Sequence, residues 1–295
     1  MSAVRTITAV PGVRAAHATD EDGQTGVTVL RFDEGARGAV WIPGSAIGSR
    51  ELNVLAAGHT ATRVHGLCLS GGSAFGLSAA DGVMAALLAD GVGYQTEYGQ
   101  VPIVPAAILF DLHTASVRPG PTLGEAATRA ASREPLPQGR FGAGRGARVG
   151  MASGTPAPGG VGSAAVEVTP FTIGAVAAVN ALGSIRDPKT GTWVAGGPVD
   201  WNQAPTPEPR QQTTLVAVVT DAPLDRDAAT VIAKMASAGM ARAIEPAFSP
   251  FDGDVVFAFS TREGPPVERL QLLRLGAAAA DLVATAIVRG VQPPA

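Results

Sequence analysis

The stretch TTLVAVVTD at residues 213–221 is a run of apolar and β-branched residues, and a second run, DVVFAFST, follows at residues 254–261. Each run precedes a longer segment in which apolar residues recur at helical spacing, at residues 225–244 and 267–291. Strands that are apolar along their whole length are typical of sheets covered on both faces. This part of the chain therefore predicts a strand, helix, strand and helix unit in a protein of the α/β class.

The first part of the chain also alternates between predicted strands and helices. Residues 26–32 and 38–42 are expected to form two separate strands, and residues 64–69 a buried strand that enters the turn SGGSAFG and a helix ending near Gly91. Further along, we expect an extended segment at 101–112, a short helix within 122–134 and a strand at 161–170. Residues 171–185 either continue as a strand or turn at Asn180, and the five prolines within residues 186–212 predict a surface connector.

The composition excludes several classes of protein. The 295 residues are 46% hydrophobic and 16% charged with a net charge of -3, which rules out a disordered chain and offers no basic stripe to nucleic acid. The single cysteine, Cys68, cannot form an intrachain disulfide or a thiolate metal site, and the four histidines lack metal-binding spacing. We therefore expect neither a metal nor a cofactor.

Nothing in the sequence predicts a membrane partner. Arg5, Pro11 and Arg14 interrupt the N-terminal segment, and Pro170 and Asn180 interrupt the longest charge-free stretch near the middle. A membrane span needs about 20 mainly apolar residues. We expect a cytoplasmic protein.

The junction between the connector and the strand at 213 carries the clearest chemical signal. Thr213 directly follows the proline-rich connector that ends at Gln212, and Asp252 and Asp254 flank a glycine where the second strand begins. A threonine freed by chain cleavage can use its own α-amino group as the base for its hydroxyl, because that amine titrates near neutral pH. The residues alone also fit a threonine at a strand edge and an ordinary Asp-Gly turn.

Taken together, the motifs resemble those of the L-aminopeptidase/D-esterase family, which includes the nylon-oligomer hydrolases. The resemblance covers nearly the whole chain. Its blocks are ITAVPGVRAAHATD near the start, SGGSAFGLSAADGVM at 70–84, VPIVPAAILFDL at 101–112, GAGRGARVG at 142–150, AAVNALGSIRDP around Asn180, QTTLVAVVTDAPL at 212–224 and ARAIEPAFSPFDGDVVFA at 241–258. It implies an αββα sandwich like that of the N-terminal nucleophile hydrolases, formed by residues 1–295 as one domain, and a homo-oligomer of four or more subunits.

The resemblance also implies a role for individual residues. Thr213 is expected to be the nucleophile, released when the bond to Gln212 is cut, which would leave chains of residues 1–212 and 213–295. Asp252 and Asp254 match the acids that position the nucleophile, and Asn180 matches a donor to the oxyanion or to the substrate carbonyl. The remaining cleft residues, expected to contact a small amide or short-peptide substrate, are Ser70, Gly71, Gly72, Ser73, Phe110 and Met151.

Three positions depart from the family pattern and leave alternatives open. Gln212 stands where relatives usually carry Asn or Gly, Met151 where many carry Lys, and Phe110 where some carry Tyr. One alternative is therefore an uncleaved relative that binds a small molecule or peptide. Another is a serine hydrolase that uses Ser73, although Phe75 breaks the G-x-S-x-G pattern. The turn at 70–76 can equally be a tight connection between strand and helix.

Overall fold

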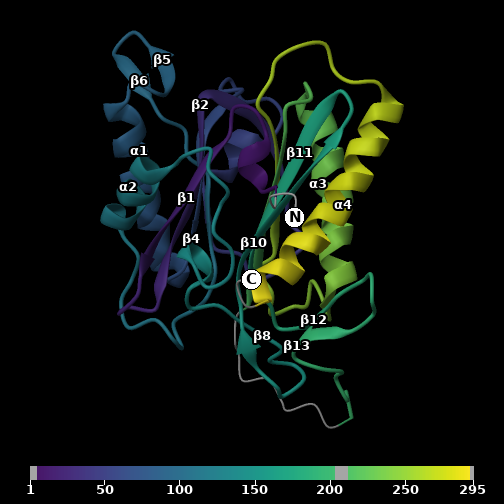
Figure 1. Ribbon diagram of the computed structural model, residues 1–295. Coiled ribbons are helices and arrows are strands. Elements are labelled where there is room, and N and C mark those ends of the chain that lie inside the picture. The colour runs from purple at the N-terminus through teal and green to yellow at the C-terminus, as the bar shows by residue number, and fades with distance from the viewer. Residues whose placement is uncertain (1–4, 203–211, 293–295) are drawn as a thin grey trace.

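The computed structural model describes residues 5–202 and 212–292, and it confirms the αββα arrangement. Two β-sheets face each other in the middle, and a pair of helices covers the outer face of each (Figure 1). The helices α1 (Ala79–Ala89) and α2 (Pro121–Ala130) lie on one side, and α3 (Arg226–Ala243) and α4 (Arg269–Val291) on the other.

The sheet next to α3 and α4 holds the strands predicted from the second part of the chain. Its order is β10 (Gly160–Val168), β11 (Phe171–Asn180), β14 (Thr213–Thr220), β16 (Val255–Ser260) and the end of β2 (Thr25–Trp41). The central pair, β14 and β16, is parallel, whereas the other neighbours are antiparallel. Helix α3 makes the crossover that a parallel pair requires.

The prediction of two strands at 26–32 and 38–42 is wrong, because both belong to the single 17-residue strand β2. Its first part pairs with β1 (Arg14–Asp20) and β4 (Val64–Ser70) in one sheet, and its last part pairs with β16 in the other. The register with β4 shifts between Arg31 and Ala36, where Gly35 has φ +70°. An irregularity of this kind bends a strand without ending it, so the chain between the two predicted strands bends instead of leaving the sheet.

The first sheet is completed by β7 (Ala106–Ile108), which is parallel to β4, and by β3 (Ser49–Arg50). Strand β1 was not predicted. The shorter elements are η1 (Ile7–Ala9), η2 (Leu52–Leu55), β5 (Tyr94–Thr96), β6 (Gly99–Val101), η3 (Ser73–Ser78), η4 (Gly142–Gly144), β8 (Arg148–Val149), β9 (Ala157–Pro158), β12 (Ser184–Arg186), β13 (Trp193–Ala195) and β15 (Ile244–Glu245). The predicted connector thus contains β13, and its residues 203–211 lie outside the described part.

Alternation along β14 shows which layer each side chain enters. Leu215, Ala217 and Val219 pack between the two sheets, whereas Val216 and Val218 pack under α3 and α4. Side chains two residues apart in a strand share a face. Thr213 therefore lies at the end of the layer between the sheets, in line with Leu215.

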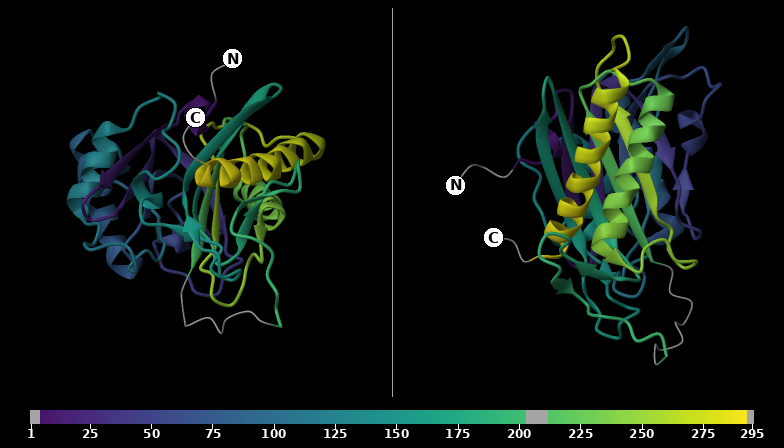
Figure 2. Two further views of the ribbon diagram at one scale, coloured as in Figure 1. Left: turned by 60° about the horizontal axis from the view of Figure 1, so that its bottom comes forward. Right: turned by 90° about the vertical axis from the view of Figure 1, so that its right-hand side faces the viewer.

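Helix α4 is, within the described residues, the one helix long and apolar enough to meet the criteria for a membrane span. In this fold its apolar residues pack on β10 and β11, and the helix lies beside α3 across the outer face of the sheet (Figure 2). More than half of its most apolar window, 56%, is buried. Packing of this kind accounts for its composition.

Candidate active site

The bond between Gln212 and Thr213 lies at the entrance to the central strand β14, with both residues almost fully buried. Thr213 pairs with Asn180 across the β11 and β14 ladder, and Gln212 forms a parallel bridge with Asp252. The structure therefore brings together four residues that the sequence predicts to act together, from three separate segments.

Two hydrogen-bond donors converge on the carbonyl oxygen of Gln212. The Thr213 hydroxyl Oγ1 donates to it at 2.6 Å, and the backbone N–H of Gly253 donates at 2.7 Å. A side chain at 253 is not compatible with this arrangement, because a Cβ there would lie 2.7 Å from Thr213 Oγ1 and 2.4 Å from the carbonyl oxygen of Ala46. The glycine between the two aspartates thus allows close approach of the backbone to the Gln212 carbonyl.

Asp252 is held by three donors. Its Oδ2 accepts from the hydroxyl of Ser249 at 2.5 Å and from the N–H of Ser249 at 3.0 Å, and its Oδ1 accepts from the N–H of Leu182 at 3.3 Å. Burial raises the pKa of the Asp252 carboxyl above its usual range, although these hydrogen bonds act in the opposite direction. A carboxyl that accepts three hydrogen bonds ionises more readily than an equally buried carboxyl that accepts fewer.

Asp254 is more deeply embedded and has fewer donors. The backbone N–H groups of Thr214, at 2.6 Å, and of Phe248 bind its carboxyl. Burial, and then the negative charge of Asp252, raise the pKa of Asp254 to about 8. Two buried carboxyls that interact this strongly titrate as a pair. At neutral pH Asp254 therefore largely keeps its proton.

The side-chain amide of Asn180 is fixed by two loops. Its Oδ1 accepts from the N–H of Arg148 at 2.9 Å, and its Nδ2 donates to the carbonyl of Phe110 at 3.1 Å. A primary amide carries two N–H donors, so one remains for a ligand. Of the two predictions for residues 171–185, the break at Asn180 is confirmed, because β11 ends at this residue and the chain bends before β12 begins at Ser184.

The predicted cleft residues are joined to this centre through the same loops. The turn at 70–73 packs on the segment after β7, since Leu109 N–H donates to Ser70 O and Ser73 N–H donates to Leu109 O. Met151 lies in a loop that pairs with the chain after Asn180, through Ala152 N–H to Leu182 O at 3.0 Å. Phe110 contacts Asn180 directly through its carbonyl. Contact of these side chains with a substrate stays a prediction.

Asp111 was not predicted from the sequence, yet it ties the cleft loops together. Its fully buried carboxylate accepts from the Thr25 hydroxyl and from the Gly72 N–H, each at 2.6 Å. Burial raises the pKa of Asp111 above its usual range. The available signal in the sequence was an acid three residues after the end of an apolar strand. Asp111 directly follows Phe110 in the chain. The hydrogen bonds that fix Asp111 therefore also help to fix the Phe110 carbonyl, which accepts from the Asn180 amide.

The alternative mechanisms depend on Ser73 and on the histidines. Ser73 is the first residue of η3 and has φ +54°. His17 bonds to the Thr28 hydroxyl and the Pro137 carbonyl, and His65 bonds to the N–H of Ile103. Within the described ranges, no group of three or more His, Cys, Asp or Glu side chains could hold a metal ion.

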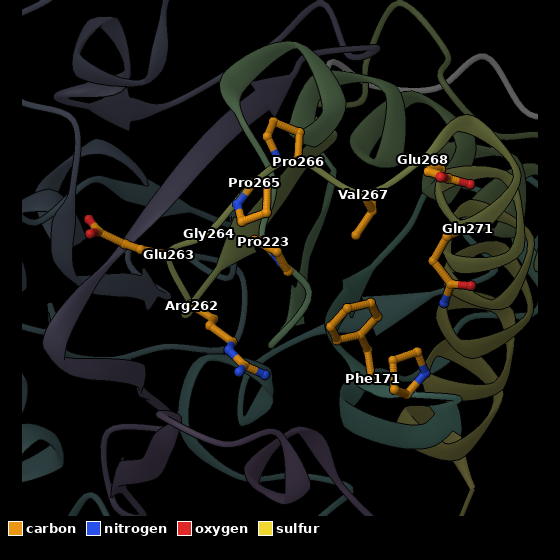
Figure 3. A pocket seen from close by; sticks show the side chains of 11 residues that line it. Phe171, Pro223, Arg262, Glu263, Gly264, Pro265, Pro266, Val267, Glu268 and Gln271 are labelled. Carbon is orange, nitrogen blue, oxygen red and sulfur yellow. The ribbon is translucent and has the colours of Figure 1, made fainter.

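A separate cavity of about 570 Å³ lies at the other end of β14 and β16 (Figure 3). Pro223, Pro265 and Phe171 line it, together with Gln271 of α4. The eight residues of β14 separate it from Thr213, which corresponds to about 25 Å. It is therefore not part of the Thr213 site.

Four layers in the order αββα are the architecture of the N-terminal nucleophile hydrolase fold, and an acid pair and a fixed amide lie here at the entrance of a central strand. The chain belongs to peptidase family S58, whose family model matches residues 5–293. It is therefore an enzyme of the peptidase and amidase kind.

Two groups of relatives support this assignment. An uncharacterized aminopeptidase of Mycobacterium tuberculosis is 36% identical over 98% of this chain and 94% of its own length. A 6-aminohexanoate-oligomer endohydrolase of Agromyces sp. is 34% identical over 86% of this chain and 74% of its own length. The relatives thus include both an aminopeptidase and an oligomer hydrolase.

Solved structures confirm the fold. A β-aminopeptidase of Burkholderia sp. superimposes with a TM-score of 0.71 at 24% identity, over 98% of this chain and 86% of that one. The L-aminopeptidase D-Ala-esterase/amidase of Ochrobactrum anthropi, described as a variant of the Ntn hydrolase fold, gives 0.74 at 20% identity, over 97% and 85%. At these identities the likeness concerns the fold alone.

Proposed function

We propose that the chain cuts itself between Gln212 and Thr213 and then hydrolyses small amides with the N-terminal threonine that this cut creates. The observation that carries the proposal is the pair of donors on the Gln212 carbonyl, Thr213 Oγ1 at 2.6 Å and Gly253 N–H at 2.7 Å. A carbonyl bound in this way is polarised, and the would-be nucleophile is the group directly beside it.

In the cleavage step, Thr213 Oγ1 loses its proton to the acid pair and bonds to the carbonyl carbon of Gln212. The negative charge that develops on the carbonyl oxygen is stabilised by the Gly253 N–H. The bond from that carbon to the Thr213 nitrogen then breaks, the nitrogen takes up a proton, and an ester joins Gln212 to Thr213. Water hydrolyses this ester and leaves a carboxylate on Gln212 and a free α-amino group on Thr213.

In turnover, the α-amino group of Thr213 accepts the hydroxyl proton as Oγ1 attacks the substrate carbonyl. An unperturbed α-amine titrates at about pH 7.7 to 8.0, so a useful fraction is neutral near pH 7. The free N–H of the Asn180 amide is the proposed donor to the substrate oxyanion. The leaving amine departs with a proton, and water releases the acid from the acyl-threonine.

The proposed substrates are short peptides, amino-acid amides and oligomers of ω-amino acids. The names of the relatives support this range, since they include an aminopeptidase and a 6-aminohexanoate-oligomer endohydrolase. The cleft loops that would select among these substrates differ from the family pattern at Phe110 and Met151.

The mass of the purified chain tests self-cleavage. Residues 1–212 and 213–295 would give fragments of roughly 21 and 8 kDa at about 0.1 kDa per residue. We expect both fragments from the unaltered chain, with Thr213 at the N-terminus of the smaller one, and one uncleaved chain from Thr213→Ala. Thr214→Val is the matched control, because the buried Thr214 hydroxyl has no partner among the described residues, and it should cleave normally.

The acids are tested in the same assay. Asp252→Asn and Asp254→Asn are each expected to slow cleavage, and complete cleavage with normal turnover in the double variant would contradict their role. A single uncleaved chain of 29.6 kDa that still binds amides would instead favour the binding-protein alternative.

A further inference from the structure

The turn before the acid pair, residues 248–251, supplies donors to both carboxyls. Phe248 N–H binds Asp254, and the next N–H, that of Ser249, binds Asp252 at 3.0 Å. Phe248 has φ +58°, a left-handed conformation that bulky residues rarely adopt. This conformation turns two consecutive N–H groups toward the two acids.

Ser249 contributes more than its backbone. Its hydroxyl donates to the same Asp252 oxygen at 2.5 Å, and Asp252 N–H returns a bond to Ser249 O at 3.0 Å. Among the described residues, no other side-chain hydroxyl donates to either acid. The Thr213 hydroxyl donates to the Gln212 carbonyl instead.

The surroundings of the acid pair allow the Ser249 hydroxyl to influence which of the two acids holds the proton. The described segments that hydrogen-bond to residues 252–254 at this turn are 44–46, 182, 212–214 and 248–251, and none of them carries a titratable side chain. The charge that raises the pKa of Asp254 is that of Asp252, and cleavage would add the α-amino group of Thr213. Hydrogen bonds then decide which of the two acids holds the proton.

We propose that Ser249 is a positioning residue that keeps the negative charge on Asp252 and leaves the proton on Asp254. Asp252 receives three donors, one of them a hydroxyl, against two backbone donors for Asp254. The base for Thr213 is thereby placed on Asp252, the acid that forms a parallel bridge with Gln212. The role of Asp252 as the base for Thr213 rests on the proposed function, whereas the location of the negative charge on Asp252 does not.

The test titrates both carboxyls in the uncleaved Thr213→Ala chain, by NMR of ¹³C-labelled aspartate, with the two signals assigned from Asp252→Asn and Asp254→Asn. Removing one hydrogen bond to a charged group in Ser249→Ala should raise the lower of the two titration steps by about one to two pH units. Ser249→Thr keeps the hydroxyl and should titrate as the Thr213→Ala chain does. If the alanine variant does not fold, Ser249→Cys, a weak donor of similar size, gives the same comparison.

Two outcomes overturn the proposal. One is a titration of Ser249→Ala that superimposes on that of the parent, and the other is a shift of equal size in Ser249→Thr. A second readout is the rate of self-cleavage against pH with Thr213 present, where Ser249→Ala should move the acid limb upward by the same one to two pH units, roughly. If the unaltered chain never cleaves, the proposed function fails, while the carboxyl titration still decides the role of Ser249.

Discussion

Replacing Asp254 with asparagine tests the charge state of the acid pair through the stability of the fold. Asn has the shape of a protonated Asp and cannot ionise. The comparison is made in the Thr213→Ala chain, so that both proteins remain uncleaved. Any fixed cost of the new amide is the same at every pH, which leaves the pH dependence as the informative quantity.

The magnitude follows from the pKa of Asp254, which burial and Asp252 raise from 3.8 to about 8. Between these values the folded chain holds a proton that the unfolded chain has released. The contribution of Asp254 to the free energy of unfolding is therefore greatest below about pH 4, falls by about 1.4 kcal/mol per pH unit, and is lost above about pH 8. The complete fall amounts to about 6 kcal/mol.

The assay is urea-induced unfolding of the two chains at unit intervals from pH 5 to pH 9. The parent should lose stability relative to Asp254→Asn by about 1.4 kcal/mol per unit up to pH 8 and change less beyond it. A difference in unfolding free energy that stays constant from pH 5 to pH 8 would refute the reasoning, because Asp254 would then be ionised in the folded chain.

Three further substitutions test the remaining parts of the site. Gly253→Ala should slow self-cleavage about 100-fold by displacing the donor to Gln212 O, measured by electrophoresis over time, with Gly120→Ala as a control because a Cβ at 120 meets nothing within 4 Å. Asn180→Ala should lower kcat about 100-fold, measured with an amino-acid amide, and an unchanged kcat would remove Asn180 from the oxyanion role. Asp111→Ala leaves the Thr25 hydroxyl and Gly72 N–H buried without their acceptor, so unfolding in urea should show a loss of about 2 to 5 kcal/mol.

The strands and helices of residues 213–291 could be predicted from the sequence because their patterns are long and regular. Strand β2 could not, since the polar residues and glycine near its middle resemble a turn, and a bend that serves two sheets depends on partners distant in the chain. Strand β1 was missed because its residues RAAHATD are not strongly β-forming.

Within the site, the sequence predicted the residues whose types suggest chemistry, namely Thr213, Asp252, Asp254 and Asn180. It did not predict Gly253, Ser249 or Asp111, whose importance lies in backbone N–H groups, in a hydroxyl three residues before an acid and in burial. Such roles depend on where the chain folds back, and a short pattern of residue types does not record that.

The order of strands around β14 has a consequence for the fate of a cut chain. Strands β14 and β16 lie between β11 and β2, so the segment after residue 212 is enclosed on both sides by the segment before it. Each piece would lack hydrogen-bond partners for its strands without the other, so the cut would have to follow folding. Once unfolded, the severed pieces would have to meet again by diffusion, and recovery would depend on protein concentration. Self-cleavage would thus convert a chain that can refold alone into a two-component assembly.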